Sequence, residues 1–207
     1  MNPAYSGPVV ARQEPHRETT PSPEEFRVAV EQMRAARLRP EILCEEMPAP
    51  QRIAPFASAL SADVTVNGTD VGTGRIVLLH DPAGNDAWDG TFRCVAYARA
   101  EIDPEMVIDP LLAEVGWTWL TEALDAHGAD YTAPSGTVTK VASESFGSMS
   151  TEDATAQLEI RASWTPSGDI AAHVEAWGEL LCAAVGLPPV PEGVVSMPSR
   201  RGQRGRG

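Results

Sequence analysis

The chain has 207 residues, 29 acidic and 16 basic side chains, and a formal net charge of −13. This length suits one domain with a hydrophobic core, and so negative a charge argues against nucleic-acid binding by the surface as a whole. The three cysteines favour buried, reduced thiols. With a polar, Pro-rich N-terminus and no apolar run long enough to cross a membrane, they predict a cytoplasmic protein.

The first 21 residues hold four prolines and little apolar clustering, so we expect residues 1–21 to be a disordered tail. The sequence SPEE that follows predicts a helix, with Ser22 as N-cap, Pro23 at the first helical position and Glu25 closing a capping box. Apolar residues then recur at helical spacing, and the helix should stop before the RPE at 39–41.

The period changes to two between Phe56 and Val66, which predicts a strand, and residues 42–47 are a candidate for an extra edge strand before it. The NGTD at 67–70 is typical of a tight hairpin. We therefore expect a strand at 73–80 to return beside the first, and a further strand at 91–101 to complete an antiparallel meander.

A second helix is predicted from Asp109 as N-cap, and a third from Asp169 to a cap at Gly186; between them lie strands at 135–146 and 156–164. The order α-β-β-β-α-β-β-α predicts an α+β fold, an antiparallel sheet of about five strands covered by three helices. We expect one globular domain over residues 22–189, followed by a flexible Arg/Gly-rich tail at 190–207.

Among catalytic motifs, the sequence contains no G-x-x-x-x-G-K-[ST], H-E-x-x-H, G-x-S-x-G or paired C-x-x-C, and we predict no cofactor and no metal. The segment LLHDPAGNDAWDG, residues 78–90, has the densest polar chemistry. Asp81, Asp86 and Asp89 could offer oxygen ligands to Ca²⁺ or Mg²⁺, and His80 with Asp81 could form an acid/base pair.

A hairpin connection accounts for the same residues, because DPAG fits a type I turn and the other polar groups can satisfy backbone donors. The aspartate spacing matches no EF-hand loop. We favour the hairpin, with His80 as a half-buried, hydrogen-bonded side chain and Trp88 as an exposed contact or a cover for the hairpin.

Three further groups of charged residues can be interpreted either as functional or as ordinary solvated surface. Lys140, Glu144 and Arg161 form either a polar cluster on an open sheet face or, as we favour, solvated cross-strand ion pairs. The first helix carries a stripe of three arginines, which either binds a partner or is simply solvated: Arg27, Arg34 and Arg37. The terminal RRGQRGRG is either an RNA-contacting segment or a solubilising end, and its arginines are Arg200, Arg201, Arg204 and Arg206.

Several long strings, among them VLLHDPAGNDAWDGTFR, DPLLAEVGWTWLTEAL and YTAPSGTVTKVASESFG, resemble an actinobacterial family known as domain of unknown function 3000, over residues 23–190. The resemblance implies no activity; it implies a gene neighbourhood with a ribonuclease D-like exonuclease. The element order also resembles the secretion-chaperone-like folds that include the YbjN group, which are dimeric modules that bind protein segments.

These features lead us to expect a non-catalytic cytoplasmic interaction module, adaptor or chaperone-like, that forms a homodimer and binds a protein partner through its sheet or a helix face. Two alternatives stay open. One is an RNA-metabolism accessory factor that uses the Arg-Gly tail. The other is a small hydrolase or metal-binding protein centred on the 80–89 loop.

Overall fold

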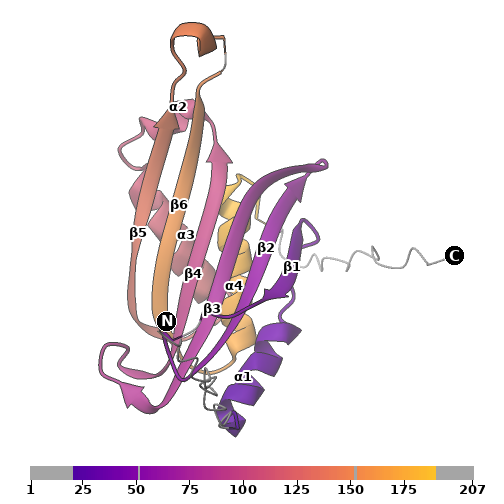
Figure 1. Cartoon of the computed structure of the whole chain (residues 1–207), viewed down its shortest axis with the longest axis vertical. Coiled ribbons are helices and arrows are strands. Elements are labelled where there is room, and N and C mark those ends of the chain that lie inside the picture. The colour runs from indigo at the N-terminus through magenta and orange to yellow at the C-terminus, as the bar shows by residue number, and fades with distance from the viewer. Residues whose placement is uncertain (1–20, 51, 152, 190–207) are drawn as a thin grey trace, which may run out of the picture.

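A single antiparallel sheet with helices on one of its faces makes up the computed structural model, which describes residues 21–50, 52–151 and 153–189 (Figure 1). In chain order the elements are α1 (Glu24–Ala35), β1 (Ile42–Met47), β2 (Phe56–Val66), β3 (Thr69–Asn85), β4 (Gly90–Ile102), α2 (Pro104–Val107), α3 (Leu112–Ala126), β5 (Tyr131–Ser143), a 3₁₀ turn (Gly147–Met149), β6 (Thr155–Pro166) and α4 (Ile170–Ala184).

The strand order in the sheet is β1-β2-β3-β4-β6-β5, and every neighbouring pair is antiparallel. The predicted α+β fold with an antiparallel sheet is therefore confirmed. The expected five strands become six, because the candidate strand at 42–47 does pair with β2, from Ile42 opposite Val64 to Met47 opposite Ala59. The one-turn helix α2 also adds to the three predicted helices.

The hydrophobic core lies between the sheet and its helices. Trp164 of β6 and Trp177 of α4 are completely buried there, beside the even-numbered residues of β4 and β6. Helix α4 approaches the sheet closely over Gly74, where a Cβ atom would stand 2.9 Å from the Trp177 ring. Glycine is required at this position because no larger residue leaves room for the helix.

Some of the local signals at chain reversals and helix ends are confirmed by the structure and others are not. Asn67 and Gly68 have the positive φ angles of a tight hairpin, and Asp169 caps α4 by accepting a hydrogen bond from the Ala171 amide. The capping box at the first helix is wrong: Pro23 is the N-cap and no side chain caps this end. The Asp109 carboxylate accepts a hydrogen bond from the Leu111 amide, but Leu111 is the N-cap and the helix begins at Leu112, later than predicted.

The two predicted tails lie almost entirely outside the described residues, so the expectation of an RNA-contacting C-terminal segment stays a prediction. In the described part of the chain, no helix is both long and apolar enough to span a membrane.

Candidate binding site

The sheet has one face that no helix covers in the described structure, and we call it the open face (Figure 1). Paired residues on neighbouring strands point the same way, and successive residues point to opposite faces. Because Ala96 and Ile160 are buried against the helices, the odd-numbered residues of the central strands lie on the open face. Those that matter for the site are Arg75, Val95, Tyr97, Thr137, Glu159, Arg161 and Ser163.

The open face contains a hollow of about 670 Å³ over β3, β4, β5 and β6, which we call the open-face hollow. Its lining has two guanidinium groups, three aliphatic hydroxyls and one phenol, but no carboxylate, histidine or cysteine. The lining residues are Arg75, Val95, Ala96, Tyr97, Ser135, Gly136, Thr137, Arg161, Ala162 and Ser163. A lining of this kind is rich in hydrogen-bond donors and carries positive charge.

One cross-strand row forms the centre of the hollow. Tyr97 pairs with Arg75 on one side and with Arg161 on the other. The guanidinium carbon of Arg161 lies 5.2 Å from the centre of the Tyr97 ring, within the range of a cation–π contact. Arg75 is exposed and forms no ion pair with any described residue.

Glu159 is the carboxylate nearest to this row along β6, and it is already engaged. Arg161 Nη2 lies 3.1 Å from its Oε2 atom. The pKa of the Tyr97 phenol is raised, chiefly by burial and then by the negative charge of Glu159. Glu159 thus fixes the row while neutralising part of its charge.

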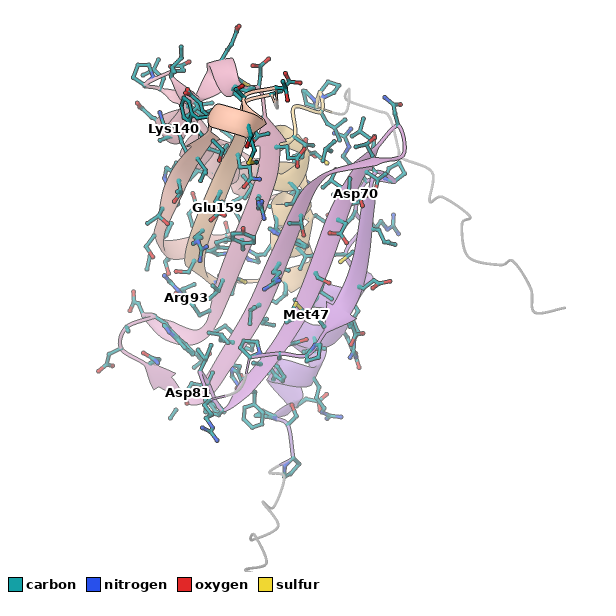
Figure 2. The ribbon with its side chains drawn as sticks, turned by 45° about the horizontal axis from the view of Figure 1, so that its top comes forward. Met47, Asp70, Asp81, Arg93, Lys140 and Glu159 are labelled. Carbon is teal, nitrogen blue, oxygen red and sulfur yellow. The ribbon has the colours of Figure 1, made fainter. Side chains whose placement is uncertain are left out.

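Arg93 lies at the edge of the hollow, buried to 7% exposure and labelled on the open face in Figure 2. Its Nη1 atom donates to the Ala133 carbonyl and to Thr165 Oγ1, both at 3.0 Å. Its Nη2 atom donates to Ser163 Oγ at 2.7 Å and to Ser135 Oγ at 3.1 Å. All of these acceptors are neutral, and none is a carboxylate.

The charge of Arg93 is therefore uncompensated by its hydrogen-bond partners. Burial lowers the pKa of this guanidinium, but an arginine starts so far above neutrality that it stays protonated. The β5 backbone is adapted to it: Ala133 has a φ of +47°, and the register shifts between Thr132 and Ser135. The Ala133 carbonyl in this bulge accepts a hydrogen bond from Arg93.

Ser135 and Ser163 connect Arg93 with the hollow. Their hydroxyl oxygens are 3.2 Å apart and each accepts from Arg93. Two hydroxyls supply two protons, and their mutual contact uses only one of them. At least one serine proton therefore remains available to an acceptor outside this pair.

His80 does not belong to this site. It is completely buried on the helix side, more than the half-burial expected, with its ring centre 4.2 Å from that of Phe92. Its Nδ1 atom is 3.1 Å from the Thr91 carbonyl. Its Nε2 atom is 3.1 Å from Glu25 Oε1, which is ion-pair distance, but the contact lacks hydrogen-bond angles. An aromatic cluster of Phe26, Phe56 and Phe92 encloses the ring.

The segment at 78–90 is a hairpin connection, as favoured, although its turn is not where DPAG placed it. Strand β3 continues through a bulge to Asn85, and the chain reverses there, with the Trp88 amide donating to the Asn85 carbonyl at 2.9 Å. The Asp81 carboxylate accepts from the Ala83 amide instead of pairing with His80. Asp86 and Asp89 are exposed, and no three such groups among the described residues could hold a metal ion.

Trp88 is half-buried, and its carbonyl accepts a hydrogen bond from the Thr165 hydroxyl. Of the two roles predicted for Trp88, its half-burial agrees better with a cover for the hairpin than with a fully exposed contact. Thr165 in turn accepts from Arg93. The hairpin is in this way tied by its backbone to the edge of the open-face hollow.

Lys140, Glu144 and Arg161 form neither a shared polar cluster nor the favoured cross-strand ion pairs with one another in the described structure. Lys140 pairs with buried Leu158, so it lies on the helix side, and its Nζ atom donates to the Asp109 carbonyl at 2.9 Å. Arg161 lies on the open face, whereas Glu144 follows the end of β5. In Figure 2, Lys140 and Asp81 lie at opposite ends of the sheet, which also separates the two predicted polar groups.

The predicted arginine stripe is only partly on the first helix. Arg27 forms an ion pair with Glu24, and Arg34 donates to both carboxylate oxygens of Glu46, at 2.7 and 3.0 Å. Arg37 lies beyond the helix end, and its backbone amide donates to Glu175. Arg27 and Arg34 are thus already paired with acids at the protein surface.

Comparison with known families identifies the chain. The model of the family described as Protein of unknown function (DUF3000) matches residues 22–195, and the chain belongs to this family. No curated protein and no solved structure matches it. The function must therefore be argued from the site itself.

Proposed function

We propose that this member of the DUF3000 family is a non-catalytic cytoplasmic protein-interaction module, adaptor or chaperone-like, and that its open face binds the partner protein. The observation that carries the proposal is the open-face hollow, about 670 Å³ in volume, with its row of Arg75, Tyr97 and Arg161. Arginine and tyrosine are the residue types that most often dominate protein–protein binding energy.

The lining of the hollow supports binding more than chemistry. General acid–base catalysis needs a group that titrates near neutral pH, and nucleophilic catalysis needs a nucleophile beside a base. The lining has neither histidine nor cysteine, and its two serine hydroxyls contact Arg93, which cannot act as a base. Guanidinium and hydroxyl groups of this kind together bind hydrogen-bond acceptors.

A protein partner fits the hollow because apolar and polar surface alternate on it. Val95 is 38% exposed in the middle of the sheet, next to Tyr97, and Val141 on β5 is also exposed on this face. A valine in the centre of a six-stranded sheet loses contact with water only when something covers the face.

The reduced state of the cysteines supports the cytoplasmic part of the proposal. Cys44, Cys94 and Cys182 are all free thiols, which is the usual state in a reducing compartment. A homodimer, as in chaperone-like modules, is compatible with the open face as a partner surface for a second copy, and this remains a prediction.

Affinity capture with the full-length chain tests the proposal. Thr137→Trp places a bulky side chain at an exposed position of the hollow, whereas Thr151→Trp makes the same change at an exposed position in the loop before β6. We expect partners captured from extracts of the source cells by the wild type and by Thr151→Trp to be lost with Thr137→Trp. Capture that is equal for all three chains would contradict the proposal.

A further inference from the structure

We infer that the open-face hollow recognises the carboxylates of an extended acidic segment in the partner protein, with Arg75 and Arg161 as the binding residues on either side of Tyr97. The inference rests on the proposed function and specifies its ligand chemistry. It is carried by four observations: the local charge, the excess of donors, the position of Arg93 and the linear arrangement of the row.

The local charge is opposite to that of the whole chain. The chain carries a net charge of −13, yet the charged residues lining the hollow are both arginines. Buried Arg93 adds a third positive charge at the edge, and Glu159 beside the row removes part of the total. A positive hollow on an acidic protein attracts anionic groups while the rest of the surface repels them.

The donors of the hollow exceed its acceptors. Arg75 is exposed and has no ion-pair partner among the described residues, which leaves its guanidinium N–H groups for a ligand. Arg161 uses Nη2 for Glu159, and its side chain is 65% exposed, which leaves other N–H groups for a ligand. One serine proton of the Ser135–Ser163 pair is also available. A ligand that satisfies these donors must bring acceptor oxygens, preferably charged ones.

Arg93 acts as a positioning residue in this arrangement. Its hydrogen bonds hold the oxygens of Ser135 and Ser163, and its own acceptors carry no charge to neutralise it. The buried cation therefore keeps the edge of the hollow positive without occupying the space that a ligand would use.

The row of residues favours an extended ligand over a compact anion. Arg75 and Arg161 are separated by one intervening strand, so their Cα atoms lie about 10 Å apart at a strand spacing of roughly 4.8 Å. Two acidic residues that are two positions apart in an extended chain point to the same side and lie about 7 Å apart, within reach of two long arginine side chains at this spacing. A single phosphate would instead need donors that converge on one point.

Fluorescence anisotropy with a labelled octapeptide of alternating Asp and Ser tests the inference on the full-length protein. The comparison peptide replaces each Asp by Asn, and inorganic phosphate is the competitor. We expect the Asp peptide to bind and the Asn peptide to fail, and Arg75→Gln and Arg161→Gln each to weaken binding about ten-fold. Arg27→Gln on α1 makes the same charge change outside the hollow and should weaken binding less than about two-fold.

Three outcomes overturn the inference. If Arg27→Gln weakens binding as much as the hollow variants do, the attraction is a general effect of charge. If the Asn peptide binds as well as the Asp peptide, the hollow does not recognise carboxylates. If phosphate displaces the peptide at a comparable concentration, the hollow is a site for a compact anion. Failure of the proposed function is distinguishable from these. If Thr137→Trp abolishes partner capture while the Asp peptide does not bind, the open face is still the interaction surface and only the ligand chemistry is wrong.

Discussion

The guanidinium of Arg161 lies over the ring of Tyr97, with 5.2 Å between the guanidinium carbon and the ring centre, and the contact joins neighbouring strands β6 and β4. This cation–π contact and the ion pair with Glu159 together restrict the position of the guanidinium. Together these contacts make part of the open face a preorganised surface, which lowers the entropy lost on binding.

Removal of the Arg93 side chain should destabilise the fold. In Arg93→Met the acceptors on Ala133, Thr165, Ser135 and Ser163 lose their charged donor, and we expect the free energy of unfolding to fall by about 2–4 kcal/mol. Urea denaturation measures the change. Arg99→Met, which removes one bond to Gln157, is the matched control and should cost less. Equal losses of unfolding free energy in both variants would show that the buried Arg93 network stabilises the fold no more than a single hydrogen bond does.

Gly136 should be essential for the packing of β5 against α3. A Cβ atom there would stand 2.4 Å from the Arg161 carbonyl and 2.6 Å from the Trp117 ring. We expect Gly136→Ala to lower the free energy of unfolding by about 1–3 kcal/mol, because backbone and indole must both shift. Thr137→Ala, one residue further on the open face, should change stability little. A thermally unaltered Gly136→Ala protein would mean that the edge strand moves freely.

His173 should make the fold less stable in mild acid. Its Nδ1 atom accepts from Trp164 Nε1 at 3.1 Å and its Nε2 atom is 3.2 Å from the Ser167 carbonyl, so the neutral ring fits the site. Burial lowers its pKa below the value near 6.5 of the unfolded chain. The unfolded state therefore binds more protons below about pH 6.5, and stability falls as the pH drops through that value.

The comparison variant for this pH dependence is His173→Gln. We expect it to show a smaller loss of stability between about pH 7 and pH 5 than the wild type, as measured by urea denaturation at each pH. His127→Gln, a substitution at a partly exposed histidine, should keep the wild-type loss. A steeper acid dependence in His173→Gln would contradict the assignment.

The three cysteines should react slowly in the folded protein. Burial raises the pKa of Cys44 to about 11 and that of Cys182 to about 12, and it also raises the pKa of Cys94. Since the thiolate is the reactive form, we expect little labelling by a disulfide reagent at pH 8 and complete labelling of all three in urea. Rapid labelling of the native protein would indicate that one thiol opens to solvent.

Local signals predicted most of the fold, because the information lay within a few residues. The Asn67-Gly68 hairpin and the Asp169 cap each depend on neighbours in sequence, and both formed as expected. The DPAG turn failed for a tertiary reason. His80 and Phe92 pair across β3 and β4, and this pairing continues through a bulge to Asn85 before the chain can reverse.

The binding site could not be read from the sequence in the same way. Arg93 stands in the apolar string TFRCVAY and looks like an ordinary strand residue, and its partners are 40 to 72 residues away. Likewise the strand pattern predicts that Lys140 and Arg161 lie together, although the register sets them on opposite faces. Strand register decides which distant side chains meet, and no local pattern specified it here.

Amide chemical-shift mapping of the full-length chain, titrated with the alternating Asp–Ser octapeptide, tests most directly whether the open face is the binding surface. We expect the largest shifts at amides of the hollow, at Val95, Tyr97, Thr137 and Ser163, and we expect their loss in Arg161→Gln. Shifts confined to the helix side, for example along α3 from Glu114 to Glu122, would contradict it.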